Sequence, residues 1–180
     1  MSRLPLIQPE AATGTTAELL AAVNKALGVT PNMTKVLANS PAALKAYLDF
    51  SAALNGGSLP AALRERIAIL VAQENGCDYC LSAHTYIATK LAGLDEAEAT
   101  RARTGQAGDA KAQAVLSFAA ATLRSRGGVD DAELKAAQEA GLSDGEITEV
   151  IAHVALNVFT NYINKAADTD IDWPVVHHHH

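Results

Sequence analysis

Two cysteines and a histidine lie in one short stretch of the chain, and their residue types could support redox chemistry. Cys77 and Cys80 are the only cysteines among the 180 residues, and His84 follows four positions after the second. An α-helix turns about 100° per residue, so offsets of 0, 3 and 7 fall within roughly 60° on one helix face. Asn75 and Gly76 precede the pair and indicate that one helix ends and another begins there. In the first turn of a helix the dipole stabilises a thiolate, and a thiolate beside a histidine is an activated nucleophile.

A carboxylate on the preceding helix is the natural partner of this histidine. Glu65 lies twelve residues before Cys77 (77 − 65), on a helix side that is otherwise apolar. The tight turn at Gly76 should make the two helices antiparallel, and Glu65 could then reach His84 in the middle of the next helix. The alternative is that Glu65 lies near the start of its helix only because the dipole favours a negative charge there.

Composition narrows the class of protein. A chain of 180 residues suits one domain with a sizeable core. The sequence is alanine-rich with only 4% aromatic residues, which favours closely packed helices, and its net charge of −6 argues against a nucleic-acid partner. No apolar run approaches the roughly 18 residues that span a bilayer, and the first ten residues lack a signal-peptide core. We therefore expect a soluble cytoplasmic protein, where a C-x-x-C pair is more often redox-active or metal-binding than structural.

Proline, glycine and capping residues divide the chain into helices joined by short connections, which predicts a single all-α domain of helical hairpins. The expected helices cover about 15–27, a short stretch from 31, 41–54, 60–74, 77–92, a short stretch after 95, 109–126, 130–141 and 144–166. Residues 1–13 should form an extended arm, and the tail after Asp168 should be irregular, with Trp173 packed on a neighbour. The domain should cover residues 1–176, because the four histidines at 177–180 resemble the remains of a purification tag.

The apolar run from Ile67 to Ala72 has no polar side, which indicates a buried helix. The alternative is a buried strand before the C-x-x-C, as in a thioredoxin-like unit. We favour the helix because helix-forming residues lead into the run from Pro60. In addition, no other segment reads as a strand that could pair with it, and a lone strand leaves its backbone unsatisfied.

The last helix carries two different stripes. Its predicted core stripe consists of Ile147, Val150, Ile151, Val154, Ala155, Val158 and Tyr162. A second stripe is polar but uncharged and consists of His153, Asn157, Asn161 and Asn164. Solvent-facing helix surfaces usually carry charge, so this second stripe should contact something. It could form a hydrogen-bond network in the core or at a subunit contact, or it could line a cavity near the cysteines.

Four residues at fixed spacing resemble a known family. Glu65, Cys77, Cys80 and His84 reproduce the E-x11-C-x2-C-x3-H pattern of the AhpD-like alkylhydroperoxidases, within the carboxymuconolactone decarboxylase superfamily. The resemblance is strongest over residues 41–125 and implies the all-α AhpD-like fold. It also implies a peroxidase in which Cys80 is the peroxidatic cysteine, Cys77 the resolving cysteine, and His84 with Glu65 the proton relay.

The resemblance also implies reaction partners. These are a small-molecule hydroperoxide, a thiol reductant protein of thioredoxin-like or lipoyl-bearing type, and further copies of the chain in a homo-oligomer; no cofactor, metal, nucleic acid or membrane is implied. Tyr79 departs from the pattern, because the best-known peroxidase of the family has a histidine between its cysteines. Tyrosine, with a pKa near 10, shuttles protons less readily at neutral pH, so the rate and the electron donor are open.

Three alternatives use the same residues differently. A general thiol–disulfide oxidoreductase would need the cysteines but no peroxide. A zinc site would use Cys77, Cys80 and His84, with His153 as a fourth ligand, although zinc sites usually take a second ligand pair from a distant segment. A helical interaction protein would leave the cysteines inert. Lactone decarboxylation ranks below these, since the decarboxylases of the superfamily generally lack the C-x-x-C.

Overall fold

The computed structural model describes residues 1–179, and within that range every regular element is helical. The prediction of an all-α fold is confirmed. After a short 3-10 turn at Pro9–Ala11, the helices are α1 (Gly14–Leu27), α2 (Asn32–Leu37), α3 (Pro41–Asn55), α4 (Ala61–Glu74), α5 (Asp78–Lys90), α6 (Glu96–Ala102), α7 (Ala110–Arg124), α8 (Asp131–Glu139) and α9 (Asp144–Ala167).

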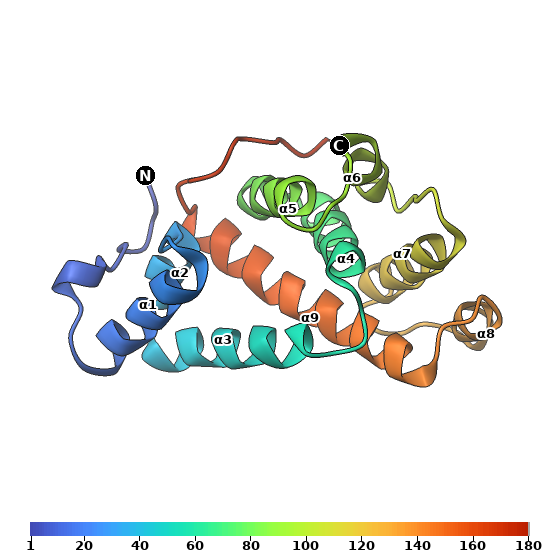
Figure 1. The fold of residues 1–180 in the computed structure, drawn as a ribbon, viewed down its shortest axis with the longest axis horizontal. Helices are drawn as coiled ribbons and strands as arrows, with labels where there is room; N and C mark the ends of the chain where they lie inside the picture. Colours follow the sequence, from blue (N-terminus) through green and yellow to red (C-terminus); the bar gives the residue numbers. More distant parts are fainter. Residues whose placement is uncertain (180) are drawn as a thin grey trace.

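Helix α4 forms the centre of the molecule. The run from Ile67 to Ala72 is almost completely buried, as its all-round apolarity predicts, and it packs against α5, α7 and α9. Figure 1 shows α9 running across most of the molecule, with α1, α2 and α3 toward one end and α7 and α8 toward the other. Helix α5 lies against α4, so the cysteine helix sits on the central helix of the core.

Most helices start at a residue whose side chain caps them. Ser143 and Asp130 each begin a helix with a complete capping box, and Asp109 accepts a hydrogen bond from the backbone of its own helix. The spacing of Asp95 and Glu98 would also allow a capping box, but this one is only half formed. Its carboxylate accepts the hydrogen bond from the backbone of Glu98, but the Glu98 carboxylate faces arginine side chains and the backbone of the following loop instead of returning to Asp95.

The predicted core stripe of α9 is partly wrong. Ile147, Val150 and Val154 are buried, but Ile151 is 42% and Tyr162 62% exposed, and Ala155 is exposed as well. The polar stripe of His153, Asn157, Asn161 and Asn164 is buried along its whole length. Hydrophobicity alone therefore misjudged the rotation of this helix, because the side that faces α4 and α5 carries amides.

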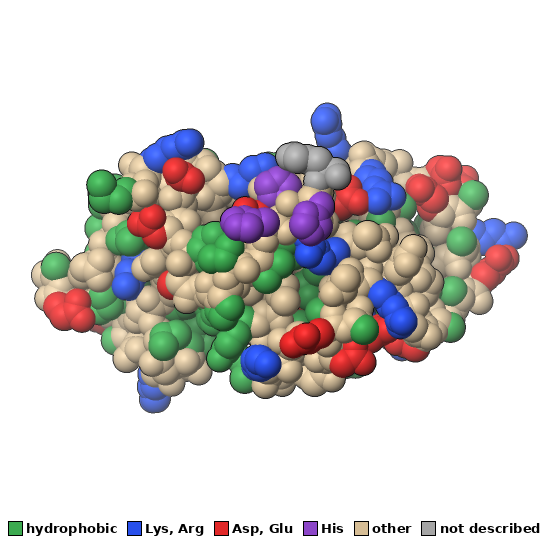
Figure 2. All heavy atoms as spheres, turned by 90° about the horizontal axis from the view of Figure 1, so that it is seen from above, with side chains coloured by type: hydrophobic (Ala, Val, Ile, Leu, Met, Phe, Trp, Pro, Cys, Tyr) green, Lys and Arg blue, Asp and Glu red, His purple; other side chains and the backbone are tan. Residues whose placement is uncertain are grey.

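The two ends of the chain lie on the helical core. Residue Trp173 stacks against Tyr86 with ring centroids 5.4 Å apart, as expected for a tryptophan that packs on a neighbour. The tail then crosses α5, where the Ser82 hydroxyl accepts a hydrogen bond from the Val176 backbone. Figure 2 shows histidine side chains gathered on this face; of the predicted tag remnant, His180 lies outside the described residues. None of the helices described is both long and apolar enough to cross a bilayer.

Candidate active site

The turn between α4 and α5 places the two cysteines. Gly76 adopts a left-handed conformation with φ of +62°, which glycine tolerates and which reverses the chain directly before Cys77. Cys77 is the N-cap of α5, and its sulfur accepts a hydrogen bond of 3.4 Å from the backbone N–H of Cys80. This hydrogen bond holds the Cys77 sulfur over the first turn of α5, and both cysteines lie at the start of the helix, as the sequence predicted. Both thiols are free and both side chains are buried.

Glu65 and His84 form a direct pair across the antiparallel helices. The His84 Nδ1 lies 2.8 Å from the Glu65 Oε2, and their side chains are 25% and 16% exposed. Burial disfavours the charged imidazole, but the charge and the hydrogen bond of Glu65 outweigh it and raise the pKa of His84. With Nδ1–H donated to the carboxylate, the other ring nitrogen of His84 is left for proton exchange.

The environment separates the two thiols. Burial disfavours the Cys80 thiolate, but a hydrogen bond with the Cys77 thiol and the nearby charge of His84 lower the pKa of Cys80 to about 7. The same hydrogen bond, together with burial, raises the pKa of Cys77. The helix dipole alone would favour a thiolate at Cys77, which lies closer to the N-terminus of α5. The observed arrangement favours the Cys80 thiolate instead, because the Cys77 thiol donates a hydrogen bond to the Cys80 sulfur.

Helix α9 brings asparagine side chains to the site. The sequence had left open whether they would reach the cysteines. The Asn164 Nδ2 donates to the Cys80 sulfur at 3.2 Å, and Asn161 also favours the Cys80 thiolate. The C-terminal half of the polar stripe therefore borders the cysteines and takes part in a buried hydrogen-bond network. In its other half, the Asn157 side chain only donates to the backbone carbonyl of His153.

A tyrosine of α3 was missed by sequence reasoning. Burial raises the pKa of Tyr47 to about 12, and negative charge on Cys80 and Glu65 adds to the effect, so this phenol lies near both groups. Its only sequence signal is its place in the apolar stripe of α3 with Leu44 and Leu48, which indicates packing and not chemistry.

Tyr79, between the cysteines, is held by another helix. Its hydroxyl accepts a hydrogen bond of 3.1 Å from the backbone N–H of Met33 in α2. Burial raises the pKa of Tyr79, which disfavours the phenolate. In this structure the residue therefore links α5 to α2.

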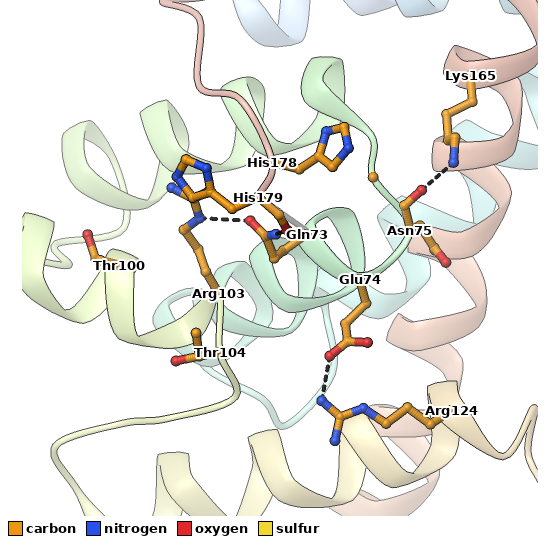
Figure 3. Close-up of a pocket in the computed structure, with 11 residues that line it drawn as sticks. Gln73, Glu74, Asn75, Thr100, Arg103, Thr104, Arg124, Lys165, His178 and His179 are labelled. Carbon is orange, nitrogen blue, oxygen red and sulfur yellow. Dashed lines mark hydrogen bonds and ion pairs between the residues drawn. The ribbon is translucent and has the colours of Figure 1, made fainter.

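A surface hollow lies beside the turn that precedes Cys77. Figure 3 shows it between α4, α6 and the C-terminal tail, with Gln73, Arg103 and Glu74 on its wall. His178 and His179 also line it, and both belong to the predicted tag remnant. The hollow therefore owes part of its shape to the tail and is not a candidate site.

The geometry does not favour the zinc alternative. Within residues 1–179 no group of three or more histidine, cysteine, aspartate or glutamate side chains is close enough to share a metal ion. His153, the suggested fourth ligand, is buried on α9.

Part of the chain matches the model of a known protein family. Residues 41–122 match the family model described as the carboxymuconolactone decarboxylase family. A curated relative, the uncharacterized protein H16_B0147 of Cupriavidus necator, is 48% identical over 46 residues, which are 25% of this chain and 41% of the relative. The match thus spans less than half of that relative.

Solved structures share the fold of almost the whole chain. An uncharacterized peroxidase-related protein with an alkylhydroperoxidase AhpD core, from Ralstonia eutropha JMP134, superposes with a TM-score of 0.85 at 23% identity, covering 95% of this chain and 92% of that one. The debrominase Bmp8 superposes with a TM-score of 0.76 at 22% identity, covering 95% and 91%. At these identities the likeness shows the fold, which is AhpD-like.

Proposed function

We propose that this protein is a thiol-dependent peroxidase that reduces alkyl hydroperoxides through a Cys77–Cys80 dithiol/disulfide cycle. One observation carries the proposal: Cys80, with a pKa of about 7, lies beside a second thiol and within reach of a Glu65–His84 pair. At neutral pH about half of such a thiol is ionised, whereas an ordinary cysteine is only a few per cent thiolate.

The reaction needs two sulfurs and one mobile proton. The Cys80 thiolate attacks the terminal peroxide oxygen, the O–O bond breaks, and the electron pair leaves with the alkoxide. His84 supplies the proton that converts the alkoxide to an alcohol, and Glu65 stabilises the charged imidazole before transfer. The Cys77 thiol then attacks the Cys80 sulfenic acid, which releases water and forms the disulfide. A reductant supplies two electrons and two protons to restore both thiols.

The reductant and the assembly belong to the same proposal. A dithiol protein of thioredoxin-like or lipoyl-bearing type could reduce the disulfide by exchange, in a cytoplasm that keeps thiols reduced. The exposed apolar side chains of α9, Ile151 and Tyr162 among them, suit a contact with another copy of the chain.

A second candidate is a general thiol–disulfide oxidoreductase. The observation that favours it is Tyr79, which is held by α2 and offers no titrating group between the cysteines at neutral pH. Its substrate would be a protein or small-molecule disulfide. The fold also occurs in a debrominase, of which a cysteine-to-alanine variant was crystallised with 2,3,4-tribromopyrrole, so the two electrons of a dithiol could also go to another acceptor.

The test is a peroxide-consumption assay with an alkyl hydroperoxide and a panel of dithiol reductants. We expect sustained consumption by the wild type and none by Cys80→Ser. With stoichiometric peroxide and no reductant, Cys77→Ser should stop at the Cys80 sulfenic acid, since it has no resolving thiol. Consumption by Cys80→Ser at the wild-type rate would disprove the assignment. Reduction of a disulfide substrate without peroxide consumption would favour the second candidate.

A further inference from the structure

Two asparagines of α9 lie in a place where side-chain amides are costly. Asn161 and Asn164 are 0% and 3% exposed, and they lie four and seven positions after Asn157 on the same helix face. Burying an amide costs free energy unless its polar atoms are hydrogen-bonded. Yet the Nδ2 of Asn161 and the Oδ1 of Asn164 have no protein partner among the described residues. Buried polar atoms that lack a hydrogen-bond partner beside a reactive sulfur suggest a role in its chemistry.

Asn164 contacts the reacting atom itself. Its Nδ2 donates to the Cys80 sulfur at 3.2 Å. A thiolate can only accept hydrogen bonds, so a donor in this position favours the ionised form over the thiol. The titratable groups around the thiol pair include Cys77 at the N-cap of α5, His84 of α5, Glu65 of α4, Tyr47 of α3 and Lys165 of α9. Among these neighbours Asn164 is a donor whose hydrogen-bonding capacity does not change with pH.

Asn161 is oriented by a second amide. The Asn75 Nδ2 donates to the Asn161 Oδ1 at 2.9 Å, and the Lys165 ammonium donates to the backbone carbonyl of Asn75. Because the Oδ1 of Asn161 accepts this hydrogen bond, its Nδ2 points away from Asn75. That group has no hydrogen-bond partner among the described residues, and it lies one helical turn before Asn164, whose own Nδ2 contacts the Cys80 sulfur. It is therefore a fixed donor beside the sulfur that is free to bind an incoming oxygen.

We propose that Asn164 and Asn161 are catalytic amide donors, the first holding the Cys80 thiolate and the second binding the peroxide oxygen that this sulfur attacks. This inference rests on the proposed peroxidase function. As the S–O bond forms and the O–O bond breaks, sulfur loses two electrons and the leaving alkoxide takes the pair and then a proton from His84. Asn161 keeps its hydrogen bond to the oxygen that remains on Cys80 as the sulfenic acid. A donor fixed in advance at a reacting oxygen is typical of electrostatic catalysis.

The thiolate half is tested by the pH dependence of Cys80 alkylation with iodoacetamide. All proteins in this test carry Cys77→Ser. Cys80 is then the only thiol that can be alkylated, and the serine hydroxyl can still donate a hydrogen bond to it. Asn164→Leu, similar in volume but without a donor, should raise the alkylation midpoint by about one pH unit, which is about tenfold less thiolate below the midpoint. Asn164→Asp, the same in shape, should raise it further. Asn157→Leu is the matched control, since this buried amide only bonds a backbone carbonyl, and its midpoint should stay unchanged.

The oxygen half is tested by peroxide oxidation in the Cys77→Ser protein above the alkylation midpoint, where Cys80 is fully ionised. There Asn161→Leu should slow formation of the sulfenic acid by about ten- to a hundredfold, whereas Asn157→Leu should not. Midpoints equal to the control in both Asn164 variants would overturn the first role, and an unchanged oxidation rate in Asn161→Leu would overturn the second. If the parent protein does not react with peroxide, the proposed function fails together with the role of Asn161. The midpoint shift of the Asn164 variants would still decide their own role.

Discussion

Replacing Glu65 by glutamine tests how the buried pair controls the nucleophile. Glutamine keeps the shape of the side chain and can still accept from the His84 Nδ1, but it removes the charge that lies 2.8 Å from the ring. The pKa of His84 should fall, because the carboxylate is what raises it against the effect of burial. A neutral imidazole no longer favours the Cys80 thiolate, so the pKa of Cys80 should rise from about 7 toward its ordinary value.

The size of the effect follows from the two limiting values. With a pKa of about 7 half of Cys80 is thiolate at pH 7, whereas at an ordinary pKa of about 8.5 only about 3% is. Glu65→Gln should therefore slow iodoacetamide alkylation at pH 7 by up to about 15-fold. The difference should disappear above about pH 9.5, where the thiol is ionised in either protein. This pH dependence separates a changed pKa from a blocked path to the sulfur.

The matched control is Glu74→Gln, on the same helix. Glu74 pairs with Arg124, away from the thiols, so its loss should leave the alkylation profile unchanged. Equal alkylation rates of Glu65→Gln and the parent protein at pH 7 would show that the Glu65–His84 pair does not tune Cys80. An equal reduction at pH 7 and pH 9.5 would point to altered access instead.

Three further changes probe the neighbouring interactions. Cys77→Ala should raise the alkylation midpoint of Cys80 above that of Cys77→Ser, since only serine can replace the donated hydrogen bond; equal midpoints would contradict this. Tyr79→Phe should cost about 1 kcal/mol of unfolding free energy in a urea titration, because the Met33 N–H loses its acceptor, and should leave the alkylation midpoint unchanged. Ser143→Ala should lower the unfolding free energy by about 1 kcal/mol through loss of a capping box, which a lower melting temperature would show. Ser143→Asp should keep most of that stability, because aspartate also caps helices.

The sequence predicted the helices well because their ends are set by local chemistry. Proline, serine and aspartate at helix starts and glycine after helix ends act within a few residues of themselves, so the pattern can be read without the tertiary fold. The Glu65–His84 contact could be anticipated for a related reason. One tight turn at Gly76 joins the two helices, and an antiparallel hairpin fixes which positions meet.

The contribution of α9 could not be predicted in the same way. Its contact with Cys80 joins residues 84 positions apart, and no local rule sets how a helix is rotated against partners so distant in the chain. Hydrophobicity favoured the face with Ile151 and Tyr162, which is largely exposed, over the face with Asn161 and Asn164, which is buried. The half-formed capping box at Asp95 has a similar cause, since Glu98 bonds to Arg66 from a distant helix instead.

The central claim is that Cys77 and Cys80 form a redox couple that a hydroperoxide oxidises. The most direct measurement is the number of free thiols and the intact mass of the reduced protein before and after one equivalent of an alkyl hydroperoxide. We predict that both thiols disappear and that the mass falls by about 2 Da, as one disulfide forms within the chain. Two thiols still titratable after peroxide treatment, or two independently oxygenated cysteines in place of a disulfide, would contradict the claim.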